Sequence, residues 1–235
     1  MKATIRENTL LIAGVLALYV LMVTGIYLMP GDLPAELVRE NGVVENVSAG
    51  GHFFFCFVLL YLHLTGVART GPAPGFFVLL LGLRELDFHE RFTSMGMFKI
   101  KFFFSPEVPW TEKIVVTLLI AGLLAYGVIY VRQILPGFKK ALLNARPWAV
   151  SVVCGVACAL TSKLVLDGNS EMIAFFLPML ENPRGFSGIM EESLELFIPV
   201  FFIMALIQYT AFEKSNEKSD GKPDQNTGST RDNTV

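Results

Sequence analysis

The sequence predicts an all-α membrane protein whose helices cross the bilayer several times. The chain of 235 residues is 53% hydrophobic and only 17% charged, whereas soluble domains carry roughly 25% charged residues. Several apolar segments also reach the length of about 20 residues that a helix needs to cross a hydrocarbon core of ~30 Å. We therefore expect a polytopic bundle of six transmembrane helices, surrounded by the lipid bilayer.

The balance of acidic and basic residues indicates which partners the chain can bind. Nineteen Lys and Arg residues face 21 Asp and Glu residues, which gives a net charge of −2. A nucleic-acid-binding domain needs a basic surface, so we expect no nucleic-acid partner. The sequence leaves protein partners and the oligomeric state open.

The first three predicted helices follow one another along the first 91 residues. The first apolar segment, residues 9–29, is longer than the apolar part of a cleaved signal peptide, and Pro30 ends it. The second, residues 44–67, is polar at its start and apolar afterwards. The third begins after Pro74 and runs over residues 75–91, ending in a strongly charged stretch.

The remaining chain contains three more predicted helices. Residues 92–113 precede them and combine many Phe residues with lysines and prolines, a mixture typical of the lipid–water boundary, so we expect an interfacial segment there. We expect residues 1–212 to form one transmembrane domain and the polar residues 213–235 to form a disordered cytoplasmic tail. The six predicted helices cover residues 9–29, 44–67, 75–91, 114–131, 148–166 and 189–211.

A stripe of small residues follows one face of the fifth predicted helix. Ser151, Gly155, Cys158 and Ser162 stand three or four positions apart, which places them on the same side of a helix. Small residues in this pattern let the backbones of membrane helices approach closely. The stripe therefore predicts a packing face.

The distribution of Lys and Arg predicts the orientation. Short cytoplasmic loops are enriched in these residues, and the loops on the side of the N-terminus contain Arg69, Arg132, Lys139, Lys140 and Arg146. The opposite loops are mainly acidic, although the interfacial segment carries three lysines there. We therefore expect both termini in the cytoplasm. The small acidic loops and the lack of soluble domains suit a bacterial cytoplasmic membrane.

This orientation gathers the ionisable residues of four predicted helices in the outer half of the bundle. Charged groups inside a membrane are costly and mark a functional site by default. Random placement would scatter them over both halves of the membrane, so we expect a common polar site. Its candidate members are Glu45, Ser48, His52, Arg84, Glu85, Asp87, His89, Lys163, Glu191, Glu192 and Glu195.

Three functions fit such a cluster. In a metal-dependent hydrolase of a lipid or membrane-embedded substrate, a zinc-like divalent metal would activate a water molecule. Glu192 would then be the catalytic base and Arg84 an anchor for an anionic group. The four candidate ligands are His52, Glu85, His89 and Glu195.

The second and third functions need no metal. In a proton- or cation-coupled small transporter, the same carboxylates would carry protons or cations, because chains of Asp, Glu and His serve as relays in membranes. In a structural or assembly protein, the cluster would only fix how the helices pack. The residue types alone do not separate these three functions.

Overall fold

The computed structural model describes residues 2–39, 42–66, 72–88, 93–97, 100–166, 173–175, 179–180 and 182–220, with the backbone alone for residues 2–7, 100, 165 and 213–220. Over these residues the regular secondary structure is entirely helical. The helices are α1 (Lys2–Tyr27), α2 (Leu33–Leu37), α3 (Val43–Leu64), α4 (Ala73–Glu85), α5 (Ile100–Phe104), α6 (Trp110–Leu143), α7 (Pro147–Thr161), the π-helix η2 (Ser162–Leu166) and α9 (Pro183–Asp220).

Five of the described helices are long and apolar enough to cross a membrane: α1, α3, α6, α7 with the start of η2, and α9. The prediction of a polytopic all-α membrane protein is thus confirmed at this level. The predicted crossing that is not among these five is the third, residues 75–91. The helix found there, α4, has only 13 residues. At 1.5 Å per residue it is ~20 Å long, too short for a hydrocarbon core of ~30 Å.

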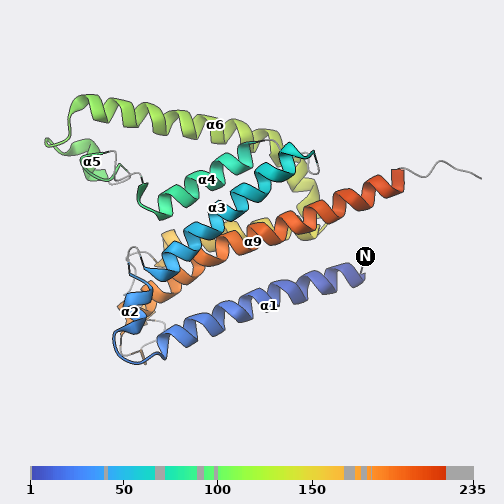
Figure 1. Ribbon diagram of the computed structural model, residues 1–235, viewed down its shortest axis with the longest axis horizontal. Coiled ribbons are helices and arrows are strands. Elements are labelled where there is room, and N and C mark those ends of the chain that lie inside the picture. Colours follow the sequence, from blue (N-terminus) through green and yellow to red (C-terminus); the bar gives the residue numbers. More distant parts are fainter. Residues whose placement is uncertain are drawn as a thin grey trace, which may run out of the picture.

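Helices α1, α3, α4, α6, α7 and α9 lie side by side, and each runs opposite in direction to the one before it in this series (Figure 1). Helix α3 contacts both α4 and α9, while α1 and α7 contact α9. At the left of Figure 1, α1 and α4 end and α3, α6 and α9 begin; we call this the site end. The N-terminus and the C-terminal part of α9 both lie at the opposite end (Figure 1).

Helix α9 supplies much of the apolar core. Phe197, Ile198 and Phe201 are buried on it and pack with Cys158 of α7. A Cβ on Gly155 would lie 2.8 Å from a ring carbon of Phe202, so only a glycine allows α7 and α9 to approach this closely. The four residues of the predicted small-residue stripe are all buried, in keeping with a packing face.

Helix α4 ends earlier than its sequence pattern predicted. The pattern extended the helix to residue 91, whereas α4 ends at Glu85, and residues 89–91 lie outside the described part. Asp87 adopts a left-handed backbone (φ 47°), which Asp tolerates better than most residues and which ends a helix. The N–H of Asp87 donates to the carbonyl of Arg84 (3.0 Å).

Helices α6 and α9 are longer than predicted. Helix α6 covers 34 residues and includes Pro136, although the apolar pattern marked only residues 114–131. Helix α9 continues to Asp220, into the segment predicted to be disordered. Extending an existing helix costs far less than starting one, and no Gly or Pro occurs between Phe212 and Gly221.

The predicted interfacial segment contains the short helix α5. Phe102 of α5 is fully buried against Val108 and Val116, so the segment packs onto the start of α6. By contrast, Phe104 is 82% and Trp110 78% exposed. Exposed aromatic side chains at the start of a membrane-crossing helix suit the lipid–water boundary.

Candidate functional site

Glu195 of α9 lies at the centre of a buried polar cluster near the site end. The residue is 4% exposed. Its Oε1 accepts a hydrogen bond from the hydroxyl of Ser162 (2.8 Å) and lies 2.7 Å from the ammonium of Lys163. The same ammonium donates to Oε1 of Glu191 (2.9 Å). Lys163 therefore bridges two carboxylates that stand one turn apart on α9.

Helix α4 adds a cation and a third carboxyl group to this cluster. The guanidinium of Arg84 lies 3.8 Å from Oε1 of Glu195. The neighbouring Glu85 is 6% exposed, and its carboxyl group lies within hydrogen-bonding range of that of Glu195. A carboxylate has no hydrogen to donate, so two carboxyl groups this close repel each other unless one of them binds a proton or a cation lies between them.

His52 of α3 completes the cluster from a third side. It is fully buried, and its Nδ1 lies 2.9 Å from the backbone carbonyl of Ser48. A carbonyl only accepts, so Nδ1 carries the hydrogen and Nε2 of the neutral ring is an acceptor. No described group hydrogen-bonds Nε2. The ring lies within electrostatic range of both Glu195 and Arg84.

Small residues allow α4 to approach His52. A Cβ on Gly82 would lie 3.1 Å from Cβ of His52 and 3.2 Å from the ring of Phe53. These separations are close to the limit for carbon atoms, so Gly82 places the end of α4 directly against α3. Glu85, one turn further on, is thereby brought to the level of the polar cluster.

Two irregularities of the helices also fall at the cluster. Ser162 and Lys163 belong to the π-helix η2, and π-helical segments occur frequently at functional sites. Pro199 lies inside α9 and has no N–H, which leaves the backbone carbonyl of Glu195 without its usual helical donor. The π-helix thus carries two groups that contact the carboxylate of Glu195.

Carboxyl groups outnumber cations in the cluster. Among the described residues, the cations that Glu85, Glu191 and Glu195 face are Arg84 and Lys163. Three carboxyls against two cations leave one excess negative charge unless a proton or another cation is bound.

Glu192 stands at the edge of the same cluster. Its Oε2 is buried and has no hydrogen-bond partner among the described residues. The carboxyl lies within electrostatic range of Glu45 on α3 and of Glu195. Glu192 and Glu45 therefore add further negative charge on this side of the cluster.

The structure therefore brings together predicted site residues from α3, α4, η2 and α9. Asp87 lies in the turn after α4, and His89 is outside the described residues. Sequence reasoning assigned Ser162 to the packing face alone and missed its hydrogen bond to Glu195. Ser162 directly precedes Lys163 in the sequence, and this position could have assigned it to the polar cluster. Ser193, fully buried with an unpartnered hydroxyl, was also missed.

The predicted metal centre rested on four ligands, one of which is His89. Among the residues that the structure describes, no three His, Cys, Asp or Glu side chains form a group that could hold a metal ion. The candidate ligand Glu195 instead contacts the ammonium of Lys163. With His89 outside the described part, the metal centre stays a prediction.

Comparisons with known proteins give no relative from which a function could be transferred. The chain matches no protein-family model, no curated protein and no solved structure.

Proposed function

We propose that this membrane protein exchanges a proton for a small monovalent cation at the Glu85–Glu195 pair. The close approach of these two buried carboxyl groups, which come from different helices, carries the proposal. The pair holds one proton in its hydrogen-bonded state. Loss of that proton leaves two carboxylates side by side, which repel each other unless a cation replaces the proton.

The charges around the pair support an exchange of one for one. With the shared proton bound, the charges of Glu191 and of the Glu85–Glu195 pair are balanced by Arg84 and Lys163. Without the proton, the same five groups carry one excess negative charge. A single monovalent cation restores the balance among these five groups, and the neighbouring carboxyls of Glu192 and Glu45 add negative charge that favours a bound cation. The proton and the cation are therefore alternative occupants of one site.

The surroundings supply further groups for both occupants. His52 presents an unprotonated Nε2 within electrostatic range of Glu195, which suits a proton acceptor next to the pair. The backbone carbonyl of Glu195, left without its helical donor by Pro199, offers an oxygen ligand for a cation. Membrane transporters also bind ions at backbone carbonyls that lack their helical hydrogen bond.

A flux measurement tests the proposed exchange. Purified protein is reconstituted into liposomes that contain a pH-sensitive dye, a pH gradient is imposed, and sodium or potassium chloride is added. We expect the cation to drive proton movement in vesicles with protein. Glu85→Gln and Glu195→Gln should each abolish this movement, because an amide cannot release a proton. Vesicles that behave like empty liposomes with both cations would contradict the proposal.

Two controls separate loss of exchange from loss of structure. Glu36 lies exposed on α2, so Glu36→Gln makes the same chemical change outside the cluster and should leave the flux unchanged. Infrared spectra in H₂O and D₂O should show a protonated carboxyl band that Glu85→Gln reduces. Absence of this band in the unmodified protein would mean that the pair holds no proton.

Metal-assisted hydrolysis of a lipid is the second candidate, because His52 presents a free Nε2 beside several carboxyls. The geometry favours proton exchange, since the oxygen of Glu195 that contacts Lys163 is already neutralised by a cation. Elemental analysis of the purified protein separates the two candidates. Near-stoichiometric zinc, manganese or iron that is lost in His52→Ala would favour the hydrolase.

A purely structural role makes a different prediction for the same variants. If the cluster only fixed the packing of the helices, Glu195→Gln would lower the stability of the protein. Any loss of flux would then match the loss of stability, as in other destabilised variants. Exchange instead requires that Glu85→Gln stop the flux while the protein still elutes and unfolds like the unmodified chain.

A further inference from the structure

A groove lies between α4 and α6, away from the polar cluster. It has a volume of about 620 Å³, within the range of roughly 300–1,000 Å³ of small-molecule sites. Figure 1 shows the two helices next to each other at the upper side of the molecule. The groove is lined by Phe77, Leu80, Ile120, Leu123, Leu124, Gly127, Val128, Val131 and Arg132.

The lining is almost completely apolar. Arg132 is the one charged residue among the nine that line the groove. The groove lies along the membrane-crossing helix α6, most of whose side chains face outwards. A groove that opens into the hydrocarbon region meets acyl chains rather than water. Its lining therefore suits a hydrocarbon chain with a charged group at one end.

The position of Arg132 along α6 matches a membrane boundary. Trp110 begins α6, is 78% exposed, and lies under the ammonium of Lys113, as expected for one lipid–water boundary. Arg132 follows 22 residues later, which is ~33 Å along a helix. This distance is close to the ~30 Å thickness of the hydrocarbon core. If α6 enters the bilayer at Trp110, this spacing brings Arg132 to the depth of the phosphate groups of the other leaflet.

The charge around this end of α6 is positive. No Asp or Glu occurs between Glu112 and Asp167, and the basic residues of this stretch beyond Arg132 include Lys139, Lys140 and Arg146. Basic residues close to the membrane surface attract anionic lipids. An Arg guanidinium also binds phosphate through two parallel hydrogen bonds.

An aromatic wall and one glycine shape the groove. The ring of Phe77 stacks on Tyr126 (5.5 Å between centroids) and lies 5.8 Å from that of Tyr130. These contacts brace α4 against α6 beside the groove. The nearest side-chain atom to a Cβ on Gly127 would be Cζ of Phe77 at 3.7 Å. A glycine at this position leaves the floor of the groove open.

We propose that the groove binds one acyl chain of an anionic phospholipid whose phosphate group is held by Arg132. The apolar lining accommodates the chain, and the arginine at the depth of the headgroups selects the negative charge. This site is independent of the proposed proton exchange, because the residues that form the groove take no part in the polar cluster.

Native mass spectrometry of the delipidated protein tests this site. The protein is incubated in detergent with phosphatidylglycerol or with phosphatidylcholine of identical acyl chains. We expect about five-fold stronger retention of phosphatidylglycerol, the contribution typical of one basic residue near a membrane surface. Arg132→Gln should reduce this retention to that of phosphatidylcholine. Equal retention of the two lipids by the unmodified protein would overturn the proposal.

Matched variants separate the groove from general surface charge. Lys139→Gln removes the same charge from an exposed position outside the groove and should keep the preference. Gly127→Phe fills the groove and should lower retention of both lipids. Gly122→Phe, where no atom lies within 4 Å of the added Cβ, should not. If Lys139→Gln lowers retention as much as Arg132→Gln does, the lipid binds only through diffuse charge, and the proposed site is wrong.

Discussion

Gly51 of α3 lies directly against the ring of Pro199 in α9. A Cβ added to Gly51 would come 2.9 Å from Cγ and 3.2 Å from Cβ of this proline, and the proline is almost completely buried. The contact brings α3 and α9 together one turn beyond Glu195. His52, the next residue on α3, is thereby held beside the carboxylate that it faces.

We expect Gly51→Ala to destabilise the protein by about 1–3 kcal/mol, the typical cost of overpacking. A rigid proline ring cannot move aside as a flexible side chain would. Gly50 is the matched control, because no atom lies within 4 Å of a Cβ at that position. Gly50→Ala should change the stability by less than about 0.5 kcal/mol. Thermal unfolding in detergent compares the stability of the two variants. Equal losses of stability would show that the contact between Gly51 and Pro199 leaves room for a methyl group.

The structure brings several of the residues expected in a common polar site near one another, while the function of this site stays a prediction. The series of apolar segments, including the one that forms the short helix α4, gave the direction of each helix, and these directions brought His52, Lys163 and Glu195 to one end. This argument needs only helix length and the alternation of crossings. It would have failed for a soluble protein, where no membrane restricts the directions of the helices.

The details that depend on contacts between helices were not predictable. The end of α4 at Glu85 depends on a left-handed backbone at Asp87, and its sequence pattern continues as charged residues without a break. Ser162 is a small residue in a packing stripe until a neighbouring helix presents Glu195 to it. A side chain acquires such a role only from partners distant in the sequence.

Because Lys163 contacts two carboxylates, the stability of the protein should depend on the balance of charges in the cluster. Lys163→Met leaves Glu191 and Glu195 without the cation that contacts both. The lysine side chain is 33% exposed, so water weakens the effect, and we expect a loss of about 1–2 kcal/mol. Removing one negative charge as well, in Lys163→Met/Glu191→Gln, should restore part of the stability. If the second substitution adds to the loss, the carboxylates do not repel each other.

A second polar network links three helices at the end opposite the site end. The hydroxyl of Ser151 donates to the side-chain oxygen of Gln208 (2.7 Å), whose amide donates to Asn8 (2.8 Å). Interhelical hydrogen bonds in membranes contribute about 0.6 kcal/mol on average. We expect Gln208→Leu to cost about 1 kcal/mol, because it removes both bonds. The exposed Gln133 is the control, and Gln133→Leu should have no measurable effect on unfolding.

A double-mutant cycle tests whether this network is continuous. Ser151→Ala and Gln208→Leu remove the same hydrogen bond, so their combined effect should be smaller than the sum of the two. Simple addition of the two effects would mean that Ser151 and Gln208 act separately.

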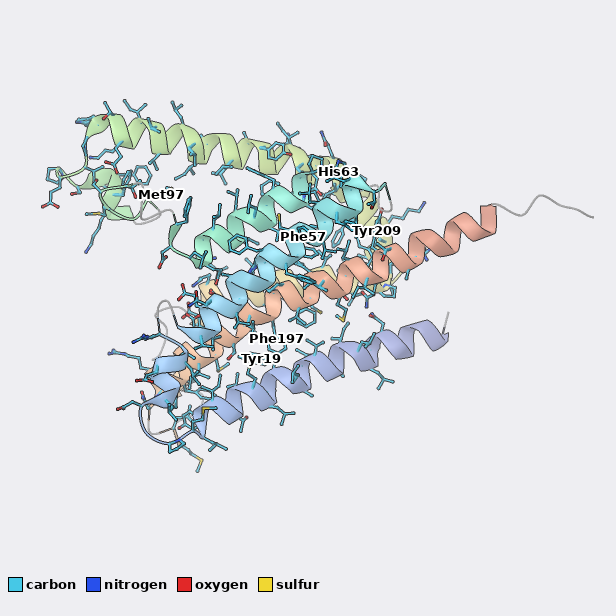
Figure 2. The ribbon with its side chains drawn as sticks, viewed as in Figure 1. Tyr19, Phe57, His63, Met97, Phe197 and Tyr209 are labelled. Atoms are coloured by element: carbon cyan, nitrogen blue, oxygen red, sulfur yellow. The ribbon has the colours of Figure 1, made fainter. Side chains whose placement is uncertain are left out.

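The contact between α1 and α9 depends on the ring of Tyr19 more than on its hydroxyl. Tyr19 and Phe197 point toward each other between the two helices (Figure 2), with centroids 5.6 Å apart in an edge-to-face arrangement. The hydroxyl donates to the carbonyl of Met190 at 3.4 Å, a long and therefore weak bond. We expect Tyr19→Phe to be nearly neutral and Tyr19→Ala to cost about 3 kcal/mol. Protease cleavage after α1 should accelerate only in the alanine variant.

The orientation of the helices decides from which side protons and cations reach the polar cluster. Glu36 is exposed near the site end, and Asn144 is exposed at the other end after α6. Because basic residues concentrate near Asn144, we expect that end in the cytoplasm. In a variant without native cysteines, a membrane-impermeant maleimide should label Glu36→Cys in intact cells and Asn144→Cys only after permeabilisation. The reverse pattern would turn the cluster toward the cytoplasm, and the flux assay would then have to impose the opposite pH gradient.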